Sequence, residues 1–366
     1  ASLSVTAQSL AENQPSVAVV RDVPATVPTA TPRAPSGTSP DGAWRAVFRD
    51  HDVWLRRTAD GTERRVTSDG SRDDAYRGPV HWSPDSSRLV VRRVRRGGDR
   101  RVHYVEAAPQ DAVQPVLHHY DYLKPGDPIP RPRPILIDVP EGVVIPIDEA
   151  LIPNPWSIDR VHWSPDSSRF SFLYNERGHQ LLRVLAVDAS SGQMRTIVEE
   201  RSPTFIDYAG KLHLTYLDEA DQVLWMSERD GWNHLYLIDA VNGAVIRQVT
   251  AGEWVVRGVD EVDPDARQVR FRAGGIHPGQ DPYHVHHARV SLDGGAPILL
   301  TEGDGTHEIT LSPDREFLID RWSRVDHPPV TELRRVEDGS LVAELERAEW
   351  SALLATGWRP PERFAA

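Results

Sequence analysis

The sequence predicts an all-β fold assembled from small antiparallel sheets. Short runs in which apolar and polar residues alternate are separated by Gly, Asn and Asp, which is typical of strands joined by hairpins. The clearest unit covers residues 222–252, with turns at 228–231 and 242–243. The composition agrees with many short strands and turns, because it includes 30 prolines and 11 tryptophans and shows no long helical pattern. Such a unit cannot bury both its faces alone, so it should recur.

The recurrence is marked by the tripeptide Ser-Pro-Asp, each time shortly before an apolar strand. Copies begin at Ser39, Ser83, Ser164 and Ser312, and a degenerate copy begins at Asp263. Two intervals between successive markers are in the forties, and two are about double that length, as though each hides an unmarked copy. A period in the forties with four strands predicts the blades of a β-propeller. The visible repeat gives seven such blades.

Charge and composition exclude several classes of partner. The chain carries 42 Lys and Arg against 54 Asp and Glu, a net charge of −12, so binding to nucleic acid or to an anionic membrane is not expected. It has no cysteine, and therefore no disulfides or thiolate metal sites, although this does not fix the compartment. No run approaches the roughly 18 apolar residues that a membrane helix requires.

In chain order, the blade pattern is interrupted at three places. Residues 1–37 are expected to be a lead-in that is partly disordered or contributes one strand. Within the propeller of residues 38–350, a second blade is expected to run through residues 101–105. A proline-rich insertion then covers residues 118–156, where interior sheet is not expected before Ile135. Residues 351–366 leave the blade pattern and are interpreted as a connector.

Five segments carry a resemblance to a known family. They are YDYLKPGDPIP (Tyr120 to Pro130), WMSERDGWNHLYLID (Trp225 to Asp239), GEWVVRGVD (Gly252 to Asp260), SPDREFLIDRWS (Ser312 to Ser323) and GWRPPERF (Gly357 to Phe364). In this order they resemble the N-terminal domain of the dipeptidyl peptidase IV branch of the prolyl oligopeptidase (S9) family of serine peptidases, in its bacterial type. The resemblance covers about Ser39 to the last residue.

The resemblance implies a β-propeller, eight-bladed in the best-known members, set over an α/β-hydrolase domain that carries the nucleophile. The expected fold class is therefore an all-β β-propeller of seven to eight four-stranded blades. The sequence contains no G-x-S-x-G motif, which a hydrolase-fold serine requires. The chain is thus expected to hold no catalytic residue, to need no cofactor and to be inactive alone, with the connector leading toward a hydrolase domain.

In the family, paired glutamates in the second visible blade hold the α-ammonium of the substrate. A buried ammonium needs neutralisation and several acceptors. The matching interval between Thr67 and Trp82 lacks this pair, and Asp73 and Asp74 are the nearest acids, for which a solvated turn is the better explanation. This departure puts strict dipeptidyl specificity in doubt.

Three further residues are candidates for substrate binding. Arg65 matches a family arginine that reaches the substrate carbonyl, although it fits equally an outward strand residue paired with an acid. Glu199 and Glu200 are a second acidic pair, for which a turn at a blade edge is the simpler interpretation.

Four histidines, His277, His284, His286 and His287, invite a metal hypothesis, but no ligand motif accompanies them, and alternating polar residues on a strand explain them as well. No metal site is expected.

Two functions remain for the chain. The first is a non-catalytic propeller that gates access and orients short peptides for a periplasmic or secreted serine exopeptidase. Its partners would be the hydrolase domain and short peptides, with a homodimer as a further option. The second is a free-standing propeller that acts as a binding module.

Overall fold

The structure is a computed structural model that describes residues 37–362 and 364. Its regular structure is almost wholly antiparallel strand, in seven sheets. The first sheet holds β1 (Trp44–Arg49), β2 (Asp52–Arg57) and β3 (Glu63–Arg65). The second holds β4 (Asp74–Trp82), β5 (Arg88–Arg95), β8 (Arg131–Asp138) and β9 (Val143–Ile145), and a separate hairpin is made of β6 (Arg101–Glu106) and β7 (Val116–Asp121).

Four further sheets follow, each with its strands in chain order. They are β10 (Pro155–Trp163), β11 (Arg169–Glu176), β12 (Leu181–Asp188) and β13 (Met194–Arg201); β14 (Leu214–Leu217), β15 (Gln222–Ser227), β16 (His234–Asp239) and β17 (Val245–Gln248); β18 (Val255–Asp263), β19 (Gln268–Gly274), β20 (Val285–Ser291) and β21 (Ile298–Leu299); and β22 (Thr306–Leu311), β23 (Phe317–Arg324), β24 (His327–Arg335) and β25 (Leu341–Arg347). The helical segments are η1 (Glu149–Leu151), η2 (Asp218–Ala220) and α1 (Ser351–Ala355).

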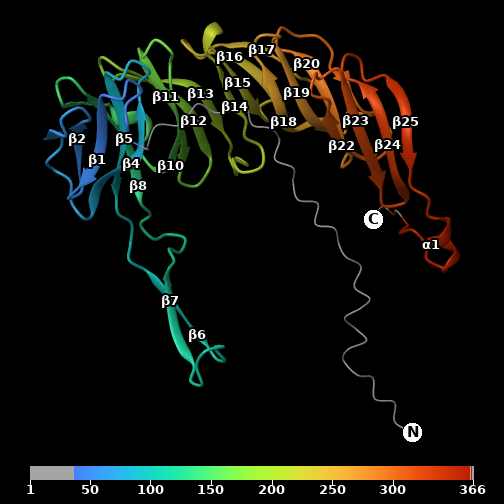
Figure 1. The fold of residues 1–366 in the computed structure, drawn as a ribbon, viewed down its shortest axis with the longest axis horizontal. Coiled ribbons are helices and arrows are strands. Elements are labelled where there is room, and N and C mark those ends of the chain that lie inside the picture. The colour runs from blue at the N-terminus through green and yellow to red at the C-terminus, as the bar shows by residue number, and fades with distance from the viewer. Residues whose placement is uncertain (1–36, 363, 365–366) are drawn as a thin grey trace.

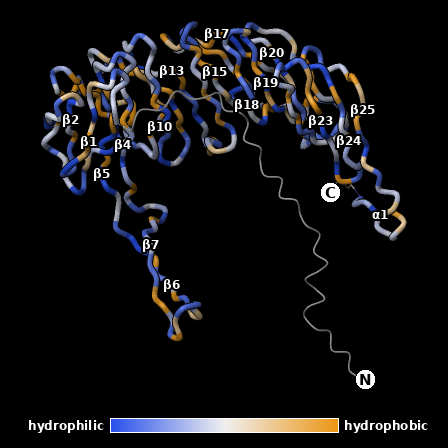
Figure 2. The backbone as a smooth tube through the Cα atoms, in the orientation of Figure 1, coloured by the Kyte–Doolittle hydropathy of each residue, from blue (hydrophilic) through white to orange (hydrophobic). Residues whose placement is uncertain are grey.

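The larger sheets stand side by side along an arc (Figure 1), with strands such as β10, β18 and β22 toward its concave side and β17 and β25 toward its convex side. Hydrophobic stretches lie along the strands of the arc (Figure 2), and inner strands such as β12 and β16 are buried almost throughout, as expected for sheets that pack face to face. The predicted all-β architecture of repeated four-stranded sheets is confirmed. Among the described residues, five sheets are four-stranded and one is three-stranded, fewer than the seven to eight blades expected.

The two long intervals between Ser-Pro-Asp markers explain this difference. The interval between Pro165 and Pro264 contains the unmarked β14–β17 sheet, as predicted. The interval between Pro84 and Pro165 contains no extra blade; its additional length is used by the β6–β7 hairpin and by the loops that lead into and out of it. Spacing alone could not distinguish an additional blade from an insertion of similar length.

The Ser-Pro-Asp turns at Ser83, Ser164 and Ser312 join the first strand of a sheet to the second, and such turns also link neighbouring sheets. In the β10–β13 sheet, the Ser164 hydroxyl donates to Asp166 Oδ1 (2.6 Å) and accepts from the backbone N–H of Arg169 (3.2 Å). The next residue of the turn, Ser167, accepts from the backbone N–H of Asp85 in the preceding turn (3.1 Å). Trp163 Nε1 donates to the carbonyl of His81 in that neighbouring sheet (3.1 Å). The repeated motif therefore sets both the local turn and the contact between sheets.

A second repeated device is a threonine just after the last strand of a sheet. The hydroxyls of Thr67, Thr250 and Thr301 accept from the backbone N–H of Val53 (2.9 Å), Leu235 (2.9 Å) and His287 (3.0 Å), respectively. The residue before each of these, Asp52, His234 or His286, also contacts the same hydroxyl. Each threonine satisfies a buried donor where two adjacent strands begin to separate.

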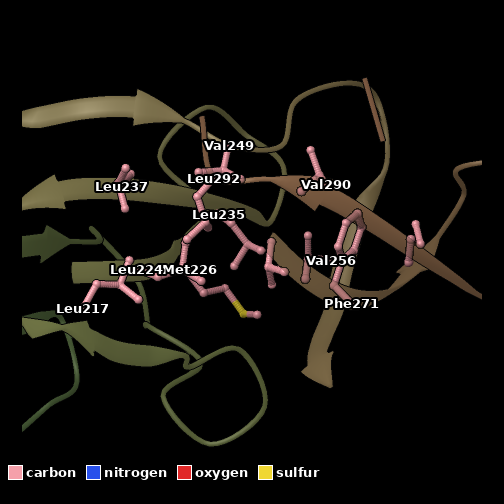
Figure 3. Packing of buried hydrophobic residues seen from close by; sticks show 13 residues of the cluster. Leu217, Leu224, Met226, Leu235, Leu237, Val249, Val256, Phe271, Val290 and Leu292 are labelled. Carbon is pink, nitrogen blue, oxygen red and sulfur yellow. The ribbon is translucent and has the colours of Figure 1, made fainter. Parts of the chain in front are cut away.

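The apolar core lies mainly between sheets. Between the β14–β17 and β18–β21 sheets, the cluster includes Leu224, Leu235 and Phe271, all fully buried (Figure 3). These positions alternate along their strands with residues of the opposite face, so each sheet can also pack on its other neighbour. Stability in such an array comes from contacts between adjacent sheets.

The expected blade strand at residues 101–105 is wrong. Residues 101–106 form β6, which pairs only with β7 in a hairpin that projects away from the arc (Figure 1). Alternation in the sequence defines a strand but not its partner, and here both faces of the hairpin are largely exposed. The proline-rich β8 pairs with β5 from Arg131 but with β9 only from Leu136, in agreement with the expectation that interior sheet starts at about Ile135. Of the predicted lead-in, residues 1–36 lie outside the described residues.

Candidate functional site

A cleft between the β10–β13 sheet and the β14–β17 sheet contains the predicted pair Glu199 and Glu200. Its volume is about 610 Å³, and its walls come from the end of β13, the following segment 202–211 and the end of β15. Charged side chains of both signs line it, namely Glu199, Glu200, Arg201, Asp207, Lys211, Glu228 and Arg229. The polarity of this cleft suits a polar or charged ligand rather than a purely apolar one.

The two glutamates are held by different partners because successive strand residues point to opposite faces. Glu199 accepts from Arg183 Nε (2.7 Å) and Arg201 Nε (2.6 Å), and the hydrogen bond from Arg201 is the largest of the effects that hold the pKa of Glu199 below its usual value. Glu200 accepts from Trp225 Nε1 (3.0 Å) of the neighbouring sheet and from Arg229, both at Oε1. One carboxylate oxygen of Glu200 is thereby fixed by two donors.

The turn after β15 positions the cation beside Glu200. Arg229 Nε donates to the Ser227 hydroxyl (2.9 Å), and the guanidinium lies 4.7 Å from the ring centroid of Tyr236. Lys211 forms an ion pair with Glu228 (2.6 Å) on the rim of the cleft. Trp225 and Arg229 were not predicted as site residues; the segment that contains them was interpreted as a strand and turn of the repeated unit and as part of the family resemblance.

Arg65 lies at the end of β3 and binds an acid of its own sheet. Its Nη2 donates to Asp52 Oδ2 (2.7 Å) and its Nε to the carbonyl of Thr67 (2.9 Å). Asp52 also accepts from the Thr67 hydroxyl (2.8 Å), so Arg65 completes a buried network around Asp52. Arg65 is therefore a strand residue paired with an acid, which is one of the two interpretations that the sequence left open.

Asp73 and Asp74 lie at the turn into β4 and have separate roles. The side chain of Asp73 is 80% exposed and makes a long contact of 3.9 Å with Arg96, which matches the interpretation as a solvated turn. Asp74 contacts Arg93 (3.1 Å) and Arg133 (3.1 Å) within its own sheet. Of the five predicted residues, Glu199 and Glu200 therefore line the cleft, whereas Arg65, Asp73 and Asp74 lie in the first two sheets and do not.

The histidines considered as metal ligands are distributed among hydrogen-bonded positions. His286 is buried between the rings of His277 (4.3 Å) and His307 (4.6 Å), and its Nε2 lies 2.8 Å from Gln280 Oε1. His287 Nδ1 lies 3.0 Å from Asp260. Within residues 37–362 and 364, no three His, Cys, Asp or Glu side chains are placed to hold one metal ion.

We expect the stability of the fold to decrease as the pH falls from about 6.5 toward 3, in part because of His286. Burial, followed by the neighbouring imidazoles of His307 and His277, lowers the pKa of His286 to about 3. In this pH range the unfolded chain binds a proton at this residue and the folded chain does not, so stability rises with pH. His286→Gln should flatten the pH dependence of the free energy of unfolding, measured by urea titrations at several pH values. An equal flattening by His103→Gln in the exposed hairpin would contradict this assignment.

The sequence matches a known protein family over most of its length. Residues 16–329 match the model of the family described as the dipeptidyl peptidase IV (DPP IV) N-terminal region, which is most of the chain. The chain belongs to this family. The family resemblance inferred from five sequence segments is thereby confirmed.

Curated relatives of this DPP IV N-terminal region match over part of their length. A probable dipeptidyl peptidase 4 of Emericella nidulans is 26% identical over 264 residues, 64% of this chain and 33% of that protein. Dipeptidyl aminopeptidase A of Saccharomyces cerevisiae is 24% identical over 245 residues, 57% of this chain and 25% of that protein. The chain thus spans about a third or less of the curated relatives that it matches.

Solved structures share the fold. The DPP IV N-terminal region described here is similar to the crystal structure of Porphyromonas gingivalis dipeptidyl peptidase 4, with a TM-score of 0.60, 20% identity and coverage of 87% of this chain and 46% of that one. A putative dipeptidyl aminopeptidase IV of Bacteroides ovatus gives a TM-score of 0.54 with 19% identity and coverage of 84% of this chain and 48% of that one. Among the described residues, no helix is long and apolar enough to cross a membrane.

Proposed function

We propose that this chain is the non-catalytic propeller domain of a dipeptidyl peptidase IV-like serine exopeptidase, in which it gates access and orients short peptides. The partner that cleaves the peptide would be an α/β-hydrolase domain, normally in the same chain. Residues 38–350 would form the propeller, with the β6–β7 hairpin as an insertion, and residues 351–366 the connector. The location that suits this role is periplasmic or secreted. The family match over residues 16–329 is the observation that carries the proposal.

The cleft at Glu199 and Glu200 supports a specific binding role. A peptide α-ammonium has three donors and one positive charge, and it needs neighbouring acceptors of negative charge. The indole of Trp225 and the guanidinium of Arg229 both donate to Glu200 Oε1, which leaves Oε2 for a third donor. Glu199 also lines the cleft, but it points to the opposite face of β13 and is bound by Arg183 and Arg201. We assign the binding of the peptide amino end to Glu200, in the place of the glutamates missing between Thr67 and Trp82.

We expect Ala-Pro-Ala-amide to bind the chain without being cleaved, and its N-acetylated form to bind at least about ten-fold more weakly, because acetylation removes the ammonium. Glu200→Gln should weaken binding of the free amine by about ten-fold, whereas Glu344→Gln, on the exposed pair with Arg347, should leave it unchanged. Isothermal titration calorimetry measures these affinities. Equal binding of both peptides, or no effect of Glu200→Gln in a variant with unchanged circular dichroism, would reject the assignment.

The β6–β7 hairpin supports the proposal of a homodimer. Tyr104, Val105, Leu117 and Tyr120 on this hairpin are half or more exposed. An isolated two-stranded hairpin is only marginally stable in water, so a partner that covers these side chains would stabilise it. We propose that a second copy of the protein covers this hairpin.

A further inference from the structure

A second cavity, of about 740 Å³, lies where the hairpin segment returns to the body of the protein. Five parts of the chain form it: β5, the loop between β7 and β8, the start of β8, the start of β10 and the turn after β11. The lining residues are Arg92, Val94, Leu123, Lys124, Pro125, Ile129, Pro130, Pro132, Trp156, Ser157, Ile158, Arg177, Gly178 and His179. Its volume is in the range of small-molecule sites.

The walls of this cavity are mostly apolar. Proline rings and the side chains of Leu123, Ile129 and Ile158 form them, and prolines present no backbone N–H to a ligand. Trp156 remains 44% exposed although it stands edge-on to the ring of His179 at 5.1 Å. Burial of His179 lowers its pKa, so this imidazole is a neutral part of the wall. Covering this apolar surface would stabilise a bound ligand at roughly 25 cal/mol per Å².

The charged side chains that line the cavity are all positive, and the nearby carboxylate of Asp127, on which Lys124 acts, pairs with Arg100. Arg92, Lys124 and Arg177 are lining residues, whereas no Asp or Glu lines it. Arg177 donates to the carbonyl of Asp127 (2.7 Å), and Arg92 lies 3.5 Å from Asp159. The ammonium of Lys124 forms no ion pair with any residue that the structure describes. The cleft at Glu199 and Glu200, in contrast, is lined by carboxylates as well as cations.

We propose that this cavity binds a ligand that joins an apolar body to a carboxylate. The apolar body would occupy the space beside Trp156 and Ile158, and the carboxylate would be held by Lys124 with Arg177 or Arg92. Such a carboxylate comes either from the C-terminal residue of a short peptide or from a fatty acid. The inference does not depend on the proposed function, because no residue of the Glu199 and Glu200 cleft lines this cavity.

Two pairs of probes test the chemistry and its source. Decanoate and decanamide share an apolar chain, and N-acetyl-Leu-Phe and its C-terminal amide share an apolar peptide; none of the four carries the ammonium that is proposed to bind at Glu200. In calorimetric titrations of the intact chain, we expect at least one carboxylate to bind about ten-fold more tightly than its amide. The pair that shows the difference identifies the source. Equal affinities within both pairs, or no binding of any probe, would overturn the proposal.

The chain provides a matched control, because Lys124 and Lys211 are its two lysines. Lys124→Gln should weaken binding of the carboxylate about three- to ten-fold, and Lys211→Gln, in the other cleft, should leave it unchanged. Trp156→Ala should weaken the carboxylate and its amide alike, because it removes apolar wall and no charge. All three positions are on loops or at a strand start and at least partly exposed, so folding is checked by circular dichroism. A loss of carboxylate binding in Lys211→Gln but not in Lys124→Gln would also reject the site.

Discussion

Replacing Asp320 with asparagine should lower the free energy of unfolding by about 3–5 kcal/mol, because the change leaves a buried guanidinium and a buried imidazole without the carboxylate that they share. Asp320 on β23 is fully buried and lies 2.8 Å from His307 Nδ1 and 3.6 Å from Arg334 Nε. His307 Nε2 lies 2.7 Å from the carbonyl oxygen of Gly303, so both ring nitrogens face an oxygen acceptor. The amide of asparagine would direct an N–H toward one of these donors.

The matched control for this substitution is Asp293→Asn. Asp293 forms a short ion pair with Arg267 (2.7 Å), but its side chain is 59% exposed, and water replaces the lost contact. Urea unfolding followed by circular dichroism compares the two variants with the parent chain. A loss in Asp320→Asn no larger than that in Asp293→Asn would show that the buried network of the β22–β25 sheet adds nothing to stability.

The repeated motifs predicted the local structure well, because their physical causes are short-range. A Ser-Pro-Asp turn requires a hydroxyl, a fixed proline φ and a carboxylate within a few residues, and Ser164 and Asp166 meet in this way. The hidden sheet between Pro165 and Pro264 was also predictable from alternation and spacing. The position of the β6–β7 hairpin was not, because Arg101 to Val105 alternate like any blade strand.

Site residues were harder to predict because they depend on contacts between sheets. Glu200 is bound by Trp225 and Arg229, which lie 25 and 29 residues away in the next sheet. Nothing in the dipeptide Glu199-Glu200 indicates these partners. Arg65 had two interpretations of equal weight, and the pairing with Asp52, 13 residues earlier, was needed to favour the structural one. A local pattern can suggest a charge pair but not which surface it faces.

Phe271→Ala should cost about 3–5 kcal/mol of unfolding free energy, since a large ring is removed from the interface between two sheets and the space cannot fully collapse. Phe271 on β19 is completely buried, and Trp254 stacks on it with ring centroids 5.8 Å apart. It packs in the cluster with Leu224 and Leu235 of the preceding sheet (Figure 3). Phe364→Ala, at a side chain that is 88% exposed, is the control for which no comparable loss is expected.

In Phe271→Ala, the width of the thermal unfolding transition should change as well as its midpoint temperature. In an array where each sheet contacts only its neighbours, stability is approximately the sum of the sheets and of the interfaces between them. Weakening the single interface at Phe271 therefore uncouples β1–β17 from β18–β25, and differential scanning calorimetry should show a broadened or divided transition. A transition that moves to lower temperature but stays as sharp as in the parent chain would mean that other contacts couple the two parts. The cluster around Phe271 would then stabilise the fold without linking the two halves of the arc.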